Sequence, residues 1–256
     1  MPFSKKASTI SPSKLDKALE KLIEEKRKEQ KDERSDDPKI VYARGMDHLL
    51  GRGVTKNTDK VFKWLRESAN HGYAPAQFIL GYMYQYGDGV TKKYLEAVKW
   101  YRKSAVQGDV GAQFNLARMY ENGFGVAQNH VEAVAWYSKS ADQGNVDTQF
   151  NLGWMYQNGD GVKNDYVEAF KWYRTSADQG DPAAQNNLGW MYKNGFGITK
   201  NVTEAVKWYD KSADQGDATG QYNLAFCYLE GNSNHEVAIS WLKNRLNKDM
   251  LELRIS

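Results

Sequence analysis

Cysteine and histidine are scarce in this sequence. Its 256 residues include a single cysteine, Cys227, and four histidines. One cysteine can form neither an intramolecular disulfide nor the thiolate cluster of a structural zinc site. We therefore expect neither of these crosslinks, and no bound metal or cofactor. The 35 Lys and Arg residues are nearly balanced by 32 Asp and Glu residues. Because binding to phosphates requires a concentrated positive charge, we expect no nucleic acid partner.

Long apolar runs are also missing. No stretch approaches the roughly 18 apolar residues that a membrane-spanning helix needs. The first residues, Met-Pro-Phe-Ser-Lys-Lys, do not lead into an apolar segment of signal-peptide length. We therefore expect a cytoplasmic protein without a membrane partner.

Aromatic residues are abundant, with 16 Tyr, 9 Phe and 8 Trp, and five of the tryptophans recur every 36 residues. A fixed period of this length is typical of repeat architectures. The tryptophans that we expect in the core of the repeats are Trp64, Trp100, Trp136, Trp172, Trp208 and, after a shorter interval, Trp241. Other columns with the same period are Gln77, Gln113, Gln149, Gln185 and Gln221; Leu80, Leu116, Leu152, Leu188 and Leu224; and Tyr84, Tyr120, Tyr156, Tyr192 and Tyr228.

Each unit carries the pattern of two helices. In the unit 75–108, Gln77, Leu80 and Tyr84 have helical spacing and predict a first helix, which the residues Gly87 to Val90 interrupt. Ala97, Trp100, Tyr101, Ser104 and Ala105 repeat that spacing and predict a second helix from about Leu95 to Gln107. The sequence thus predicts an all-α solenoid of about six antiparallel helix pairs.

Helix ends have their own sequence signals. Asn129, Asp165 and Asn201 precede second helices and are followed three residues later by glutamate, the arrangement of a capping box. Gln-Gly-Asp or Gln-Gly-Asn recurs after each second helix, where glycine can end one helix and the next residue can cap another. Gly81, Gly153 and Gly189 lie inside first helices, and we expect a Trp or Tyr ring of the second helix to lie against them.

These columns resemble a known family. The pattern L-G-x-x-Y-x-x-G-x-G-V, followed by A-x-x-W-Y-x-x-S-A-x-Q-G, is similar to the Sel-1-like repeat, a relative of the tetratricopeptide repeat. The resemblance is clear from Leu80 to Gly216, looser at both ends, and covers about four-fifths of the chain. It implies a right-handed α-solenoid that acts as a non-catalytic scaffold or adaptor for other proteins.

The same family includes cysteine-rich secreted members, some described as penicillin-binding or β-lactamase-like. The alternative function is therefore a repeat-fold hydrolase acting on β-lactams or cell-wall fragments. This sequence departs from those members because it has one cysteine. Its four histidines occupy different columns and form no recognised catalytic motif, and the Gly-Asp-Gly loops lack the ladder of acidic residues that binds calcium. We therefore predict no catalytic site.

A second stripe of the first helices is variable where the core is constant. In tetratricopeptide-like solenoids the first helices line the concave face, so the resemblance implies a binding groove for a protein or peptide. The expected groove residues are Tyr82, Gln85, Arg118, Glu121, Trp154, Gln157, Trp190, Lys193 and Phe226. Phe78, Phe114 and Phe150 either belong to this groove or seal neighbouring repeats.

We divide the chain into three parts, and we expect it to be a monomer. Residues 1–37 are a charged tail with a short apolar stripe, which either remains a frayed helix or docks on the first repeat as a cap. The solenoid spans 38–247, with units at about 39–72, 75–108, 111–144, 147–180, 183–216 and 219–247. Residues 248–256 close the C-terminal end.

Overall fold

The computed structural model describes residues 36–230, and in this part of the chain all regular structure is helical. The helices are α2 (Pro38–Leu50), α3 (Thr58–Asn70), α4 (Ala74–Tyr86), α5 (Tyr94–Ala105), α6 (Val110–Asn122), α7 (His130–Ala141), α8 (Val146–Asn158), α9 (Tyr166–Asp178), α10 (Pro182–Asn194), α11 (Val202–Asp214) and α12 (Ala218–Glu230). They form five helix pairs and the first helix of a sixth, as the sequence predicts. The expectations for the tail up to residue 35, for Trp241 and for residues 248–256 lie outside the described residues.

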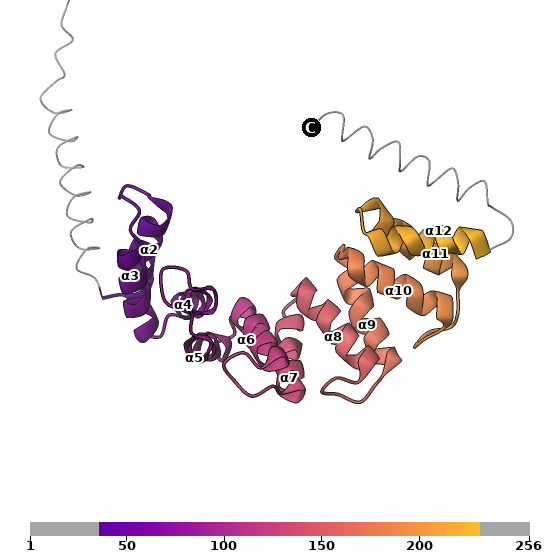
Figure 1. The fold of residues 1–256 in the computed structure, drawn as a ribbon, viewed down its shortest axis with the longest axis horizontal. Helices are drawn as coiled ribbons and strands as arrows, with labels where there is room; N and C mark the ends of the chain where they lie inside the picture. Colours follow the sequence, from indigo (N-terminus) through magenta and orange to yellow (C-terminus); the bar gives the residue numbers. More distant parts are fainter. Residues whose placement is uncertain (1–35, 231–256) are drawn as a thin grey trace, which may run out of the picture.

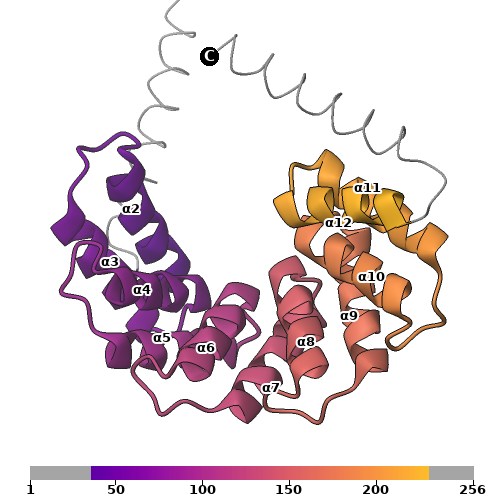
Figure 2. The same ribbon diagram turned by 45° about the vertical axis from the view of Figure 1, so that its right-hand side comes forward.

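The helix pairs stack into a curved array (Figures 1 and 2). Every helix packs against the helix before it and the helix after it in the chain. In addition, the first helices α4 and α6 contact each other, and so do α10 and α12. The first helices therefore lie on the inner side of the arc, and the second helices lie on the outer side (Figure 2).

The second helices begin at the predicted caps. The side chains of Asn129 and Asn201 accept hydrogen bonds from the backbone N–H groups of Glu132 and Glu204, at 3.1 Å in both cases. A capping box also predicts a return hydrogen bond from the N–H of the capping residue to the glutamate side chain, and this prediction is wrong. The backbone N–H of Asn201 donates instead to the carbonyl of Tyr192 in the preceding helix, at 2.8 Å, and Glu204 pairs with Lys207. The cap thereby ties the two helices of a unit together.

The tripeptide between units has the two predicted roles. Gly144 adopts a left-handed conformation with φ of 91° after α7, which a glycine can do without steric cost. The next residue, Asn145, accepts a hydrogen bond from the backbone of Thr148 at 2.9 Å and caps α8. Asp181 caps α10 in the same way through the N–H of Ala184, at 2.6 Å.

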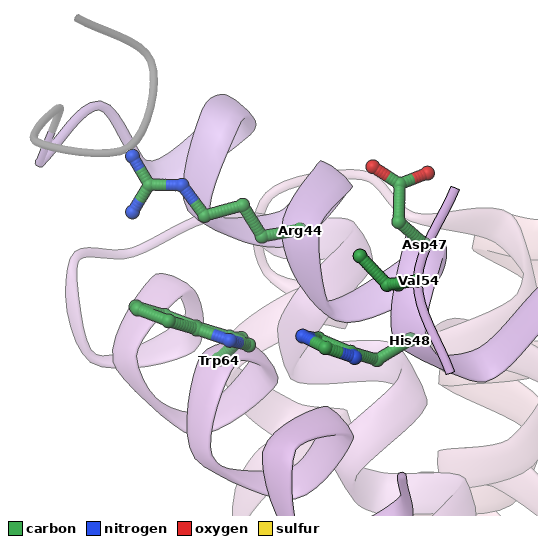
Figure 3. A pocket seen from close by; sticks show the side chains of 5 residues that line it. All are labelled: Arg44, Asp47, His48, Val54 and Trp64. Carbon is green, nitrogen blue, oxygen red and sulfur yellow. The ribbon is translucent and has the colours of Figure 1, made fainter. Parts of the chain in front are cut away.

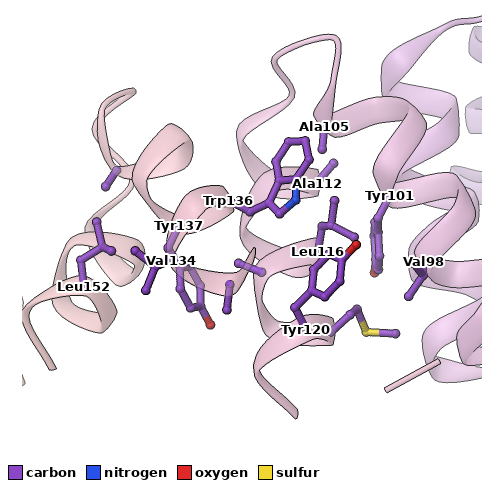
Figure 4. Close-up of a cluster of buried hydrophobic side chains, with 14 of the residues drawn as sticks. Val98, Tyr101, Ala105, Ala112, Leu116, Tyr120, Val134, Trp136, Tyr137 and Leu152 are labelled. Carbon is purple, nitrogen blue, oxygen red and sulfur yellow. The ribbon is translucent and has the colours of Figure 1, made fainter. Parts of the chain in front are cut away.

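The side chain that lies against the small residue of α4, α6, α8 and α10 is a tyrosine, whereas Leu65 lies against Gly45 of α2. Tyr101, Tyr137, Tyr173 and Tyr209 are all at most 1% exposed. A methyl group added to Gly81 would lie 2.5 Å from the ring of Tyr101, which is closer than atoms can approach. This contact explains why glycine or alanine occupies the column inside a helix. Figure 4 shows Tyr101 and Tyr137 in the central core, with Leu116 and Trp136.

The tryptophans contribute unequally to the core. Trp100, Trp136 and Trp208 are buried, and Trp100 packs in one cluster with Leu65 of the preceding unit. Trp172 packs against the central cluster but is only half-buried. Trp64 is also half-buried, because the described residues include no preceding second helix to cover it. Trp100, Trp136 and Trp208 thus lie within the buried core, whereas Trp64 and Trp172 lie at its edge.

Buried glutamines form a polar line through the array. Gln113 of α6 donates to the carbonyl of Ala105 in the preceding unit at 3.1 Å and accepts from Gln143 of its own unit at 2.8 Å. The same two bonds recur at Gln77, Gln149 and Gln185, which are also buried. These side chains satisfy carbonyl groups at the ends of the second helices.

Aromatic stacks join some loops to the preceding unit. Phe124, in the loop after α6, stacks on Tyr94 at the start of α5, with ring centroids 5.0 Å apart. Phe196 stacks in the same way on Tyr166, at 4.9 Å. At the intervening junction the equivalent positions hold His130 and Asp160. The junctions therefore alternate along the array.

The unequal burial of neighbouring rings predicts unequal effects on stability. We expect Tyr173→Ala to lower the free energy of unfolding by about 3–5 kcal/mol, because it removes a fully buried ring. Trp172→Ala should lower it by less, although the removed side chain is larger. Urea denaturation of the two variants checks the order, and an equal or larger loss for Trp172→Ala would contradict the assignment of the core ring.

The cap of α10 supports a matched pair of substitutions. Asp181→Ala should lower the free energy of unfolding by about 1 kcal/mol, because the N–H of Ala184 loses its acceptor. Asp181→Asn should preserve stability, since asparagine fills this position at Asn145 and burial raises the pKa of the Asp181 carboxyl. Thermal and urea denaturation measure both. Equal destabilisation by alanine and asparagine would show that loss of the capping hydrogen bond is not the source of the lower stability.

Candidate functional site

The first helices carry one row of large side chains, which we call the concave row: Tyr82, Arg118, Trp154, Trp190 and Phe226. Each comes from the same position of a first helix, and Trp190 also packs against two core clusters. Tyr82, Trp154 and Phe226 are 44%, 42% and 39% exposed, and Arg118 is exposed as well. Such rings project into solvent although a packed core lies beneath them.

Three members of the row are supported by neighbouring rings, and Tyr82 lies 4.4 Å from the ring centroid of Tyr86. Trp190 is only half-buried and stacks on Phe196 of the following loop, with centroids 4.7 Å apart. Phe226 lies 6.2 Å from Tyr222 in a nearly parallel arrangement. The ammonium group of Lys193 lies 4.3 Å from the Phe226 ring centroid and forms an ion pair with Glu230 at 2.6 Å. These contacts orient the C-terminal part of the row.

The remaining expected groove residues lie deeper. Gln85 is buried, because it accepts a hydrogen bond at 2.6 Å from the hydroxyl of Tyr101. Glu121 is half-buried and accepts in the same way from Tyr137 at 2.7 Å. The assignment of Gln85 to an exposed groove surface is therefore wrong, since its role is to satisfy a core tyrosine. Burial also raises the pKa of the Tyr101 and Tyr137 hydroxyls.

The equivalent pair in the next unit is not satisfied. The hydroxyl of Tyr173 and the side-chain oxygen of Gln157 are both buried and have no hydrogen-bond partner within the described residues, although Asn187 lies near the hydroxyl. A buried polar group without a partner destabilises a fold by about 1–3 kcal/mol. This unit is therefore a weak point beneath Trp154.

The three phenylalanines of the neighbouring stripe pack between repeats. Phe78 and Phe114 are half-buried against the central cluster, and Phe150 packs in the next cluster. The ring of Phe78 comes within 3.0 Å of the point where a side chain on Gly111, in the next unit, would begin. These rings seal the seams between repeats, which was one of the two interpretations of the sequence.

The N-terminal end of the array has a pocket lined partly by charged and polar side chains (Figure 3). Its volume is about 360 Å³, and Arg44, Asp47, His48, Val54 and Trp64 line it. Arg44 occupies the position of the buried leucine of later units, and Asp47 occupies that of the buried methionine. The polar substitutions suit an end face that no repeat covers, as in other solenoids. Sequence reasoning missed these residues, although counting back 36 from Leu80 and Met83 finds them.

Metal-ligating side chains do not cluster in the part of the chain described. Among residues 36–230 there is no group of three or more His, Cys, Asp or Glu side chains placed to hold a metal ion. Cys227 is buried, and burial raises the pKa of its thiol. Within the same residues, none of the helices combines the length and apolar character needed to cross a bilayer.

Comparison with protein families explains the repeated geometry. The Sel1 repeat profile matches six consecutive segments, at 42–73, 74–109, 110–145, 146–181, 182–217 and 218–243, which together cover most of the chain. The chain belongs to the Sel1 repeat family. Sel1 repeat proteins are generally scaffolds for protein interactions and are typically non-catalytic.

Two solved structures place this Sel1 repeat chain among bacterial relatives. The protein c5321, a protective antigen of uropathogenic Escherichia coli with the same fold, is 40% identical and has a TM-score of 0.75, over 80% of this chain and 44% of that chain. This chain thus spans less than half of that protein. A Sel1 repeat protein from Oxalobacter formigenes is 34% identical with a TM-score of 0.68, over 81% of this chain and 84% of that chain. No curated protein gave a match.

The hydroxyl of Tyr101 has a hydrogen-bond partner and that of Tyr173 has none among the described residues, so removing each hydroxyl should have a different effect on stability. Tyr101→Phe should lower the free energy of unfolding by about 1 kcal/mol or more, because Gln85 loses its donor. Tyr173→Phe should be neutral or stabilising, because its hydroxyl donates to no described residue. Urea denaturation compares the two variants. A larger loss for Tyr173→Phe would show that this hydroxyl does have a partner.

Proposed function

We propose that this protein is a non-catalytic adaptor that binds a partner protein or peptide along the concave row. The single observation that carries the proposal is the exposure of the rings of Tyr82, Trp154 and Phe226 on helices whose opposite faces are closed in the core. Tyrosine, tryptophan and arginine dominate the energetics of protein interfaces, and the row contains all three. The scaffold role of the family supports the same function.

The arrangement also suits a rigid platform. The row is carried by helices rather than by loops. Side-chain caps fix the starts of α6, α8 and α10, and each helix of the row contacts its neighbours in the chain. A surface fixed in this way loses little conformational entropy when a ligand binds. The rival function, hydrolysis of β-lactams or cell-wall fragments, has no converging nucleophile and base among the described residues to support it.

Substitution of one exposed ring tests this proposal. Trp154→Ala should leave the helical content and the melting temperature close to those of the wild type while it weakens the capture of partner proteins, and Trp190→Ala should weaken it too. Trp136→Ala, by contrast, should destabilise the array by about 3–5 kcal/mol, because that ring is buried. Circular dichroism and pull-down with purified variants measure both properties.

The control is Val131→Ala, which shortens an exposed apolar side chain on the outer helix α7. Partners of the concave row should be retained by this variant and lost by Trp154→Ala. Loss of the same partners in both variants, or an equal drop in melting temperature for Trp154→Ala and Trp136→Ala, would refute the assignment. Turnover of a β-lactam or glycan substrate by the pure protein would refute the adaptor function itself.

A further inference from the structure

The second helix α5 has a hollow, which we call the outer hollow. Its volume is about 470 Å³, within the usual range of ligand pockets. Leu95 is 57% exposed, so a large apolar side chain stands in solvent at this place. The residues that line the outer hollow include four apolar side chains and three exposed cations, which are Leu95, Val98, Trp100 and Val126, and Lys99, Arg102 and Lys103.

A small side chain helps to create the outer hollow. Phenylalanine occupies the position of Val98 in α3 and α9. The ring of Phe170 in α9 packs edge-on against Tyr192 of the next helix, with centroids 5.4 Å apart. In α5, Val98 packs in one cluster with the equivalent Tyr120 but has no ring to place against it. The space therefore suits a ring that a partner supplies.

Positive charge surrounds the outer hollow. Residues 92–103 include five Lys or Arg residues and a single acid, Glu96, which pairs with Lys99 at 2.6 Å. Within the described residues, Arg102 and Lys103 form no ion pair. Both lie against aromatic rings, with their charged groups 5.7 and 4.2 Å from the ring centroids. An acidic partner would therefore complement this surface.

The equivalent arginine of α9 has the acid that Arg102 lacks. Arg174 pairs with Asp178 at 2.8 Å, one helical turn later. In α5 the position of Asp178 is occupied by Val106, which is 67% exposed. Compared with α9, α5 thus lacks both the ring that fills the space and the acid that neutralises the arginine.

We propose that the outer hollow is a second docking site, which binds an acidic segment of a partner protein and takes up one large apolar side chain from it. The apolar side chain contacts Leu95 and Val98, and the carboxylates of the segment pair with Arg102 and Lys103. The site is on a second helix, whereas the concave row is on the first helices. A chain with both sites joins two partners.

A displayed library of random linear peptides provides the probe, and the full chain is the bait. The selected peptides should contain Trp, Phe or Leu next to Asp or Glu residues. A synthetic peptide of this consensus should bind Val98→Phe at least about 10-fold more weakly, because the added ring fills the outer hollow. The melting temperature should stay close to that of the wild type, since phenylalanine is native at this position in α3 and α9.

The matched control is Val206→Phe, which makes the same change at the equivalent position of α11 and should bind the peptide as the wild type does. If Val98→Phe lowers the melting temperature, Leu95→Asp takes its place in the binding measurement. Its effect on folding should be small, because Asp59 occupies this exposed position in α3. It should abolish binding, because it removes an apolar contact and adds a negative charge.

The charge is tested by Val106→Asp. The new carboxylate should pair with Arg102 as Asp178 pairs with Arg174, and should weaken binding of the consensus peptide about 5-fold. Thr203→Asp, which adds the same charge to an exposed residue of α11, should leave the affinity unchanged.

A consensus without acidic residues, or equal binding by the wild type, Val98→Phe and Leu95→Asp, would overturn this inference. Binding to phosphatidylserine vesicles without selection of any acidic peptide would overturn it too and assign the cations to a membrane surface. The selected peptides should still bind Trp154→Ala. Loss of binding in that variant would assign them to the concave row, so it would refute the second site and support the first.

Discussion

The close contact between a tyrosine of α5, α7, α9 and α11 and a small residue of the first helix of the same pair sets the geometry of those pairs, and Leu65 takes the place of the tyrosine in the first pair. Because the ring of Tyr173 lies where a side chain on Gly153 would begin, the two helices approach closely and without a gap. A residue larger than alanine at this column would force the pair apart and shift every later unit. The curvature of the inner face, and with it the spacing of the concave row, follows from this one contact.

Polar groups connect one unit to the next. The buried glutamine of α4, α6, α8 and α10 donates to a carbonyl of the preceding unit and accepts a hydrogen bond from a glutamine of its own unit. Carbonyls at the end of a helix need such partners when no water can reach them. Apolar packing alone would tolerate sliding between repeats, whereas a directional bond fixes the register. The exposed side chains of the first helices are therefore free to vary without changing how the units join.

Much of this architecture could be predicted from the sequence, because the helix pairs, caps and turns depend on residues within a few positions of each other. The Gln-Gly-Asp tripeptide and the cap at Asn201 are examples. The depth of Gln85 could not be predicted in this way, since it is set by the hydroxyl of Tyr101, sixteen residues later and in another helix. Periodicity identifies which residues share a face, but not how far each lies from solvent. For Trp172 and Trp136, identical positions in the repeat lead to different burial.

The stacks of Phe124 on Tyr94 and of Phe196 on Tyr166 recur after 72 residues rather than 36, with His130 and Asp160 between them. A helix pair is thus not interchangeable with its immediate neighbour. Deleting one unit between the two stacks would pair a phenylalanine with a histidine, or an aspartate with a tyrosine. Deleting two units would instead pair Tyr94 with Phe196 and keep one stack intact.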